Sequence, residues 1–315
     1  MSLQVTTLQR HLKEKKRKKL KEAFVGWSFI SIPMFLFITM NIGVLFFAIY
    51  MSFHDWGIMG SRGNVGMKYY KAAFHDHIFL KAIRNSILYA LIVVPLQTAL
   101  GLFLAIIINA KIRGAKFFRA TFYFPSIASS AAITTLFIFL MAPDGIFNKI
   151  LSFFGVDIAN LFNQGAWLSD SRTALYSIIG LNAWTTSGTM MLFYLANLQT
   201  VDGTYVEAAA IDGATPRQIF WKITMPLLKP AHFFVMASGM IGALQLYDQA
   251  ILAGGADGSP DYSLMTMVLY IYNLSFRHFE FGYAAAIGVI LFAIIFALTV
   301  AQRYAFGNSA WNTDG

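Results

Sequence analysis

The sequence predicts an all-α, polytopic membrane protein with six transmembrane helices and a helical loop on the cytoplasmic side. Of its 315 residues, 57% are hydrophobic and only 12% are charged, whereas a typical soluble domain carries about 25% charged residues. The apolar residues also gather in long stretches without Asp, Glu, Lys or Arg, and a transmembrane helix needs about 20 such residues. The expected spans lie within a domain over 23–303, at about 25–51, 86–109, 121–142, 173–197, 231–253 and 281–302.

The first stretch is expected to be a retained span rather than a signal peptide. The uncharged run 23–53 is too long for a signal-peptide core, and no small-residue cleavage site follows it. Trp27 and Trp56 bracket the run, as interfacial aromatic residues do. A further uncharged run, 262–276, is too short to span and is interpreted as an extracytoplasmic segment or a partial dip into the membrane.

The distribution of basic residues predicts the orientation. Six spans place both termini on one side, and a cytoplasmic N-terminus puts 16 of the 24 Lys and Arg residues inside, as the positive-inside rule favours. Eight of them lie at 10–21, within the basic N-terminal segment 1–22. We interpret this segment as a topology signal that also attracts anionic lipid, in preference to nucleic acid. The tail 304–315 is then cytoplasmic.

Several function classes are excluded or disfavoured by composition. The chain has no cysteine, which excludes disulfides, thiolate metal sites and a cysteine nucleophile. His75 and His77 flank Asp76 without an evident third ligand, so a hydrated outer loop is favoured over a metal site. No G-x-x-x-x-G-K-[ST] phosphate loop occurs. We therefore expect no catalytic residue, metal or cofactor in this chain, and any use of ATP requires a separate ATPase.

The predicted cytoplasmic loop 201–230 carries strong helix signals. Thr204 and Glu207 have capping-box spacing, and the helix they begin should end at Gly213, a preferred left-handed terminator. Thr215 to Gln218 is a second capping box with Pro216 in the first turn, and its helix should end before Pro226. A helix of about two turns is marginal alone in water, so the alanine-rich first helix is predicted to dock on a partner.

Residues of this loop resemble a known motif. Glu207, Ala208 and Ala209, then Gly213, then Ile223 and Pro226 resemble the EAA loop of ABC-importer permeases, with Met225 at a position where leucine is usual. Further segments resemble the carbohydrate-uptake permeases related to the maltose and glycerol-phosphate systems, although Ala256 stands where proline is common. These segments are Val65–Tyr70, Phe124–Ser126, Asp144–Asn148, Trp167–Asp170, Ala253–Gly255 and Phe281–Ala286.

The resemblance implies a permease of the prokaryotic inner membrane with several partners. These would be a cytoplasmic ABC ATPase dimer that binds ATP and Mg, a second permease subunit, an extracytoplasmic solute-binding protein and a sugar substrate. It also implies that the motif residues of the loop contact the ATPase. The alternative for Glu207 is that it only caps its own helix.

Polar residues within the expected spans are candidates for the substrate path, because they are costly in lipid. Asp248 is the only charged residue inside an expected span. Gln245, Asp248 and Gln249 should share a helix face, and Tyr247 could stack on a sugar ring. The alternative is that Asp248 lies near the outer end of its span and is simply hydrated.

A second set of candidates follows from proline and small polar residues. Pro125 can bend the third span around a cavity, which would expose the serines that follow it; close helix packing is the alternative explanation for those serines. The candidates are Ser126, Ser129, Ser130, Asn182, Trp184, Thr185, Thr186, Tyr270 and Asn273.

Two other functions compete with an ATP-driven permease. A secondary transporter or channel for a small polar solute predicts intramembrane charge pairs or symmetric broken helices, and only Asp248 is available. A membrane enzyme would need a catalytic grouping that does not stand out. Both alternatives leave the loop 201–230 unexplained.

Overall fold

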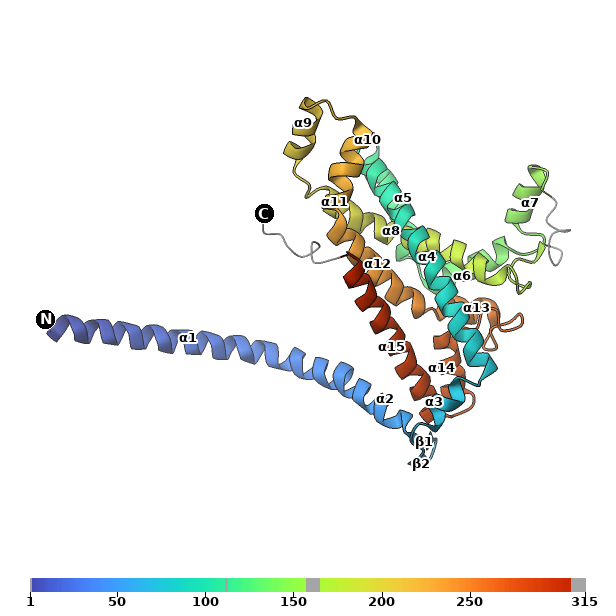
Figure 1. Ribbon diagram of the computed structural model, residues 1–315, viewed down its shortest axis with the longest axis horizontal. Helices are drawn as coiled ribbons and strands as arrows, with labels where there is room; N and C mark the ends of the chain where they lie inside the picture. The colour runs from blue at the N-terminus through green and yellow to red at the C-terminus, as the bar shows by residue number, and fades with distance from the viewer. Residues whose placement is uncertain (1, 111–112, 157–164, 307–315) are drawn as a thin grey trace.

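The computed structural model describes residues 2–110, 113–156 and 165–306, so the predicted tail lies outside the described residues from 307 onward. The described residues are almost entirely helical (Figure 1), apart from an antiparallel hairpin of β1 (His54–Gly57) and β2 (Gly60–Asn64). The helices are α1 (Ser2–Phe37), α2 (Val44–Ser52), α3 (Lys68–Ala73), α4 (His77–Asn109), α5 (Ala115–Ile127), α6 (Ser130–Leu140), α7 (Ile146–Phe153), α8 (Ala174–Leu198), α9 (Gly203–Ile211), α10 (Pro216–Ile219), α11 (Met225–Leu227), α12 (Lys229–Leu244), α13 (Asp248–Gly254), α14 (Met267–Phe276) and α15 (Phe281–Phe306), with π-helical turns at Ile38–Gly43 and Phe220–Thr224.

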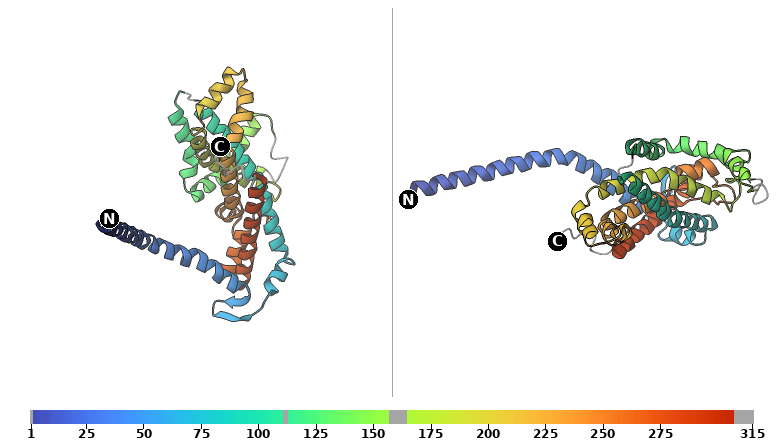
Figure 2. Two further views of the ribbon diagram at one scale, coloured as in Figure 1. Left: turned by 60° about the vertical axis from the view of Figure 1, so that its left-hand side comes forward. Right: turned by 90° about the horizontal axis from the view of Figure 1, so that it is seen from above.

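The first expected span belongs to a helix that extends away from the rest of the molecule. α1, the π-helical turn after it and α2 are continuous, and Lys15–Ser52 is long and apolar enough to cross a membrane. None of its most apolar window is buried, and the views of Figures 1 and 2 agree that the helix projects outward. Its last part, α2, packs against α15. Lipid or another membrane protein must cover the remaining apolar surface.

The body of the molecule is built around α4, α8, α12 and α15. α4 and α15 are each long and apolar enough to span. α8, over the fourth expected span, has 25 residues but is more polar, and it packs against α4, α5 and α12. Ser177, Asn182 and Ser187 of α8 are buried against neighbouring helices, so these polar residues need not face lipid. Fully buried core residues join these helices, including Phe79, Ile178, Met191, Tyr194, Leu244 and Ile287.

The third expected span is bent near Pro125, as predicted, and a second bend lies just before the fifth expected span at 231–253. α5 and α6 meet at 95°, and the helical stretch Pro216–Leu227 meets Lys229–Gly254 at 64°. Within the described part of the chain, three single helices and these two bent pairs have the length and composition of spans. A sixth span would have to be α8, which is not apolar enough to be recognised by composition. The count of six spans therefore stays a prediction.

The uncharged run 262–276 forms a loop and the ten-residue helix α14, which packs against α4 and α15. Asn85 of α4 donates to the carbonyl oxygens of Tyr262 (2.8 Å) and Met265 (3.0 Å). Ser86 accepts from the backbone N–H of Met267 at 3.0 Å. These bonds satisfy backbone groups that would otherwise be buried without partners. The segment is therefore a fixed part of the bundle.

Candidate functional site: a polar cavity at two helix breaks

The first break lies between α5 and α6. Pro125 is buried within α5, where its missing N–H and its ring weaken the helix. The helix ends two residues later at Ile127, and Ala128 has the extended backbone that turns the chain toward α6. Ser129 is exposed in this turn and Ser130 begins α6. The bend expected near Pro125 is thus a complete interruption of the helix.

The second break lies between α12 and α13. The helix ends at Leu244 and resumes at Asp248, so the prediction that Gln245, Asp248 and Gln249 share one continuous helix face was wrong. The reason is tertiary: the carbonyl oxygen of Leu246, freed by the break, accepts a hydrogen bond from the Thr266 hydroxyl at 2.7 Å. Irregular backbone at membrane depth is tolerated where such partners exist.

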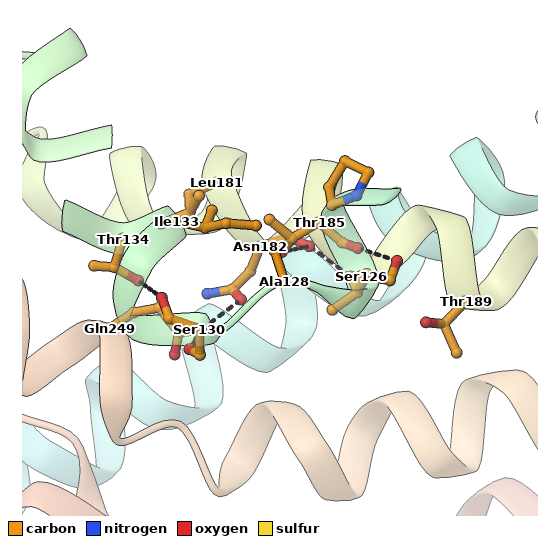
Figure 3. A pocket seen from close by; sticks show the side chains of 12 residues that line it. Ser126, Ala128, Ser130, Ile133, Thr134, Leu181, Asn182, Thr185, Thr189 and Gln249 are labelled. Carbon is orange, nitrogen blue, oxygen red and sulfur yellow. Dashed lines mark hydrogen bonds between the residues drawn. The ribbon is translucent and has the colours of Figure 1, made fainter. Parts of the chain in front are cut away.

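A glutamine joins the two breaks through α8. Gln249 Nε2 donates to Ser130 Oγ at 2.9 Å and to Asn182 Oδ1 at 3.2 Å. The three residues come from α13, α6 and α8, and Figure 3 shows their side chains converging at the edge of a cavity. Asn182 is buried, and its Nδ2 has no hydrogen-bond partner within the described residues. A buried donor without a partner is unfavourable, so this amide is ready to bind a ligand or water.

Two cavities meet at this bridge, with Asn182, Thr186 and Gln249 lining both. The smaller, of about 170 Å³, lies between α5, α6 and α8, and the larger, of about 280 Å³, lies between α4, α8, α12 and α13. The smaller is lined by Pro125, Ser126, Ala128, Ser130, Ile133, Thr134, Leu181, Asn182, Thr185, Thr186, Thr189 and Gln249. Polar residues of the larger are Tyr89, Gln97, Asn182, Thr186, Ser238, Gln245, Tyr247, Asp248 and Gln249.

Gln97 is a site residue that the sequence analysis missed. Its side chain is buried, and Thr186 donates to its Oε1 at 2.6 Å. The available signal was an amide side chain in the middle of an apolar stretch, which is the same signal that drew attention to Gln245 and Gln249. Ser126, by contrast, was a candidate and lines the smaller cavity, but its hydroxyl donates to the Thr185 carbonyl at 2.6 Å.

Four candidates line neither cavity: Ser129, which is exposed in the turn before α6, and Trp184, Tyr270 and Asn273. The Tyr270 hydroxyl donates to Asp76 Oδ2. Asn273 donates to the Ala256 carbonyl at 2.5 Å and holds the loop before α14. Trp184 packs its ring against Phe137, with centroids 5.9 Å apart. The last three side chains hold helices and loops in place. They do not line the cavity that contains Asp248.

Asp76 joins three elements on the side of the molecule opposite the loop 201–230. It caps α4 by accepting from the N–H groups of Ile78 (2.9 Å) and Phe79 (3.3 Å), and it accepts from the hydroxyls of Tyr270 and Tyr283. Burial alone would raise the pKa of this carboxyl, but these hydrogen bonds together hold it below its ordinary value. His75 and His77 are exposed, which fits the expected hydrated loop, while Asp76 between them connects α4, α14 and α15.

The first helix of the loop 201–230 begins two residues earlier than expected. Asp202, rather than Thr204, is the N-cap of α9, and it accepts from the Thr204 N–H at 2.9 Å and from the Thr204 hydroxyl at 2.7 Å. The Thr204 hydroxyl is therefore engaged, and the predicted capping box with Glu207 does not form. Gly213 ends the helix with a φ of +81°, a conformation that glycine adopts without steric penalty.

The second helix begins as predicted and ends later. The capping box between Thr215 and Gln218 is present in full. The prediction that the helix stops before Pro226 was wrong, because a π-helical turn over Phe220–Thr224 precedes the proline and the helix continues to Leu227. A π-helical turn changes the hydrogen-bond register, so the missing N–H of proline can be accommodated.

The loop presents an exposed, uncovered surface. Glu207, Ala208 and Gly213 are exposed, and Ile211 is 86% exposed. Between the two helices lies a pocket of about 280 Å³ lined by Asp212, Gly213, Ala214, Gln218, Ile219, Lys222 and Ile223. At the top of Figure 1 the two helices project beyond the ends of the long helices. This geometry suits a docking element.

The fold and the site define an integral-membrane component of a transport system. Residues 97–306 match the family described as binding-protein-dependent transport system inner membrane component, and the chain belongs to this family.

Two relatives and one solved structure show how far the similarity extends. The multiple sugar-binding transport system permease protein MsmF of Streptococcus mutans is 31% identical over 90% of this chain and 96% of MsmF. The lactose transport system permease protein LacF of Rhizobium radiobacter is 34% identical over 74% of this chain and 77% of LacF. A chain of a bacterial alginate ABC transporter, crystallised with an alginate pentasaccharide-bound periplasmic protein, has a TM-score of 0.78 at 19% identity, covering 93% of this chain and 98% of that chain. The last likeness is one of fold.

Proposed function

We propose that this chain is the permease subunit of an ABC importer and forms half of the translocation path for a sugar or oligosaccharide. Two relatives that cover most of the chain are named for sugar transport, MsmF for multiple sugars and LacF for lactose. The observation that carries the proposal is the polar cavity at the two helix breaks, where the buried Asn182 Nδ2 has no hydrogen-bond partner among the described residues. Amide and hydroxyl groups are suitable partners for sugar hydroxyls.

The substrate path then runs through the two cavities. Gln245, Tyr247 and Asp248 line the larger one and Ser126 and Ser130 the smaller, with Asn182 and Gln249 shared. The Tyr247 ring packs against Tyr272 with the ring centroids 5.3 Å apart, and the side chain is only partly buried; we infer that its exposed part contacts a sugar ring. Because the Gln249 bridge connects α6, α8 and α13, its bonds must change when the two helix breaks move apart. We infer that this exchange accompanies alternating access.

The energy for transport comes from a separate ATPase dimer that docks on the α9–α10 loop and holds ATP and Mg. The support is the exposed surface of α9, where Glu207 and Ala208 are exposed and Ala209 is only partly buried. A second permease subunit supplies the other half of the path, and an extracytoplasmic binding protein delivers the cargo. The long exposed face of α1 is consistent with a membrane partner. Both termini lie in the cytoplasm, on the same side as this loop.

Charge reversal in the loop tests the docking role. We expect Glu207→Lys and Gly213→Asp to abolish the stimulation of ATPase activity by loaded binding protein in the reconstituted complex, because one alters the docking face and the other strains a φ of +81°. Membrane insertion, followed by the yield of the purified chain, should be unchanged.

A matched control is Lys116→Glu, an exposed charge reversal at the start of α5. It should keep most of the stimulation. Full stimulation in both loop variants would refute the docking role, and so would purification of the intact complex without any ATPase subunit.

A further inference from the structure

The charges that line the path are unusual for a chain with a net charge of +9. Among the described residues that line the two cavities, none is Lys, Arg or His. The one charged side chain is Asp248, which opens into the larger cavity. The basic residues that the structure describes line neither cavity, so among the described residues the charge facing the path is that of a carboxylate.

Asp248 has no counter-ion within the described part of the chain. The ion pairs found there are Lys81–Asp261, Arg172–Asp170 and Arg277–Asp257, and all of them lie in loops or at helix ends outside the cavities. Asp248 is the first residue of α13 and is exposed. Its charge is therefore presented to whatever enters the larger cavity.

An unpaired carboxylate discriminates between cargoes by charge. At a separation of about 6 Å and an effective dielectric constant of about 20, repulsion between two like charges weakens binding by roughly a hundredfold, and salt reduces this toward tenfold. A neutral sugar meets no such repulsion, and an amino sugar is attracted. Recognition of carboxylates normally uses Arg or Lys, and the lining offers neither.

We propose that the path through this subunit is built for saccharides without carboxylate groups, neutral or amino-substituted, and that Asp248 excludes uronates. This inference rests on the proposed function as a sugar permease. It separates the chain from its structural neighbour, which is described as importing the acidic polysaccharide alginate. On this proposal, two permeases with the same fold differ in whether they accept negatively charged sugars.

The first test identifies the cargo. The purified binding protein of the system is screened by thermal shift against neutral, amino-substituted and uronate-containing oligosaccharides of equal length. We expect stabilisation by neutral or amino sugars. If only uronate-containing sugars bind, the inference is overturned. If no saccharide binds and none is taken up by the complex, the proposed function itself fails.

The second test measures selectivity in the permease. Uptake of a neutral sugar and of its carboxylate analogue is measured in proteoliposomes that contain the complete complex with saturating binding protein, for the natural chain, Asp248→Asn and Asp248→Glu. The ratio of the two uptake rates in the variant is divided by the ratio in the natural chain. The contribution of the binding protein cancels in this double ratio.

We expect Asp248→Asn to shift the double ratio toward the carboxylate analogue by about tenfold, and Asp248→Glu to leave it near one. Asp257→Asn is the control, because that carboxylate is paired with Arg277 and lines neither cavity. An unchanged ratio in Asp248→Asn, with uptake still measurable, overturns the role of Asp248. A third outcome is that the neutral sugar is transported but no variant transports the carboxylate analogue. This outcome supports the cargo class and contradicts the role of Asp248 as its determinant.

Discussion

At the scale of single residues, carboxylates in this chain act through the groups that surround them. Asp76 and Asp248 are both near helix N-termini, at the cap of α4 and the first position of α13. Asp76 accepts four hydrogen bonds and is half-buried, whereas Asp248 is exposed in a cavity without an ion-pair partner in the described residues. The first is therefore a structural joint, and the second is free to meet cargo.

Replacing Asp76 should weaken the end of the bundle where α4, α14 and α15 meet. We expect Asp76→Asn to lower the free energy of unfolding by about 1–2 kcal/mol, because two tyrosine hydroxyls and two backbone amides lose an ionised acceptor. The measurement is the unfolding midpoint in detergent, followed by tryptophan fluorescence. Asp144→Asn, a change at an exposed carboxylate, should leave that midpoint unchanged.

The same joint predicts a pH dependence. The folded pKa of Asp76 lies below its ordinary value of 3.8, so the stabilisation is fully present above that value and is lost as the pH falls through the folded pKa. The difference in unfolding midpoint between the natural chain and Asp76→Asn should be constant from about pH 8 to 5 and shrink below about pH 4. A difference that grows on acidification would contradict the assignment.

At the scale of elements, the sequence predicted what is local and missed what is tertiary. The capping box at Thr215 and the terminator Gly213 formed as expected, because each depends on residues within one turn. The start of α9 was wrong by two residues, since Asp202 and Thr204 are both good caps and only the structure shows which one is used. The gap at 245–247 contains neither proline nor glycine, and it depends on Thr266, which lies about 20 residues away.

The candidate site followed the same division. Polar residues in apolar stretches could be found from the sequence, and Asn182, Asp248 and Gln249 do line the cavities. Their partners could not be found, because Gln249 reaches Ser130 across 119 positions of the chain. Tyr270 gave the same sequence signal as Gln249, yet its hydroxyl is bound to Asp76. Which polar residue faces the path is decided by packing between helices.

Close packing of α5 on α8 is expected to depend on Gly188. A Cβ there would overlap the Phe122 carbonyl oxygen and lie 2.7 Å from Ser126 Oγ. We expect Gly188→Ala to push α5 away, break the Ser126–Thr185 hydrogen bond and lower stability by about 1–3 kcal/mol. Gly180→Ala on the same helix is the matched control, because a Cβ at 180 meets no atom within 4 Å. Equal unfolding midpoints for the two variants would contradict the packing argument.

At the scale of the whole molecule, the arrangement of the elements has a definite polarity. The loop of α9 and α10 lies at one end of the body, and the hairpin of β1 and β2 lies toward the other (Figure 1). The basic N-terminal segment continues directly into the first apolar stretch within α1. If that segment is cytoplasmic, one crossing of the membrane precedes the hairpin and places it outside. Four expected crossings precede the α9–α10 loop, which places this loop in the cytoplasm.

This topology can be tested cleanly because the chain contains no cysteine, so each introduced thiol is unique. Met59, at the hairpin tip, is 95% exposed, and Ala210 is exposed on α9. In intact cells a membrane-impermeant maleimide should label the Met59→Cys variant, and it should label Ala210→Cys only after permeabilisation. Ala250→Cys, at a position with 0% exposure, controls for reagent access and should remain unlabelled. Labelling of Ala210→Cys from outside would reverse the orientation, and no cytoplasmic ATPase could then reach the loop.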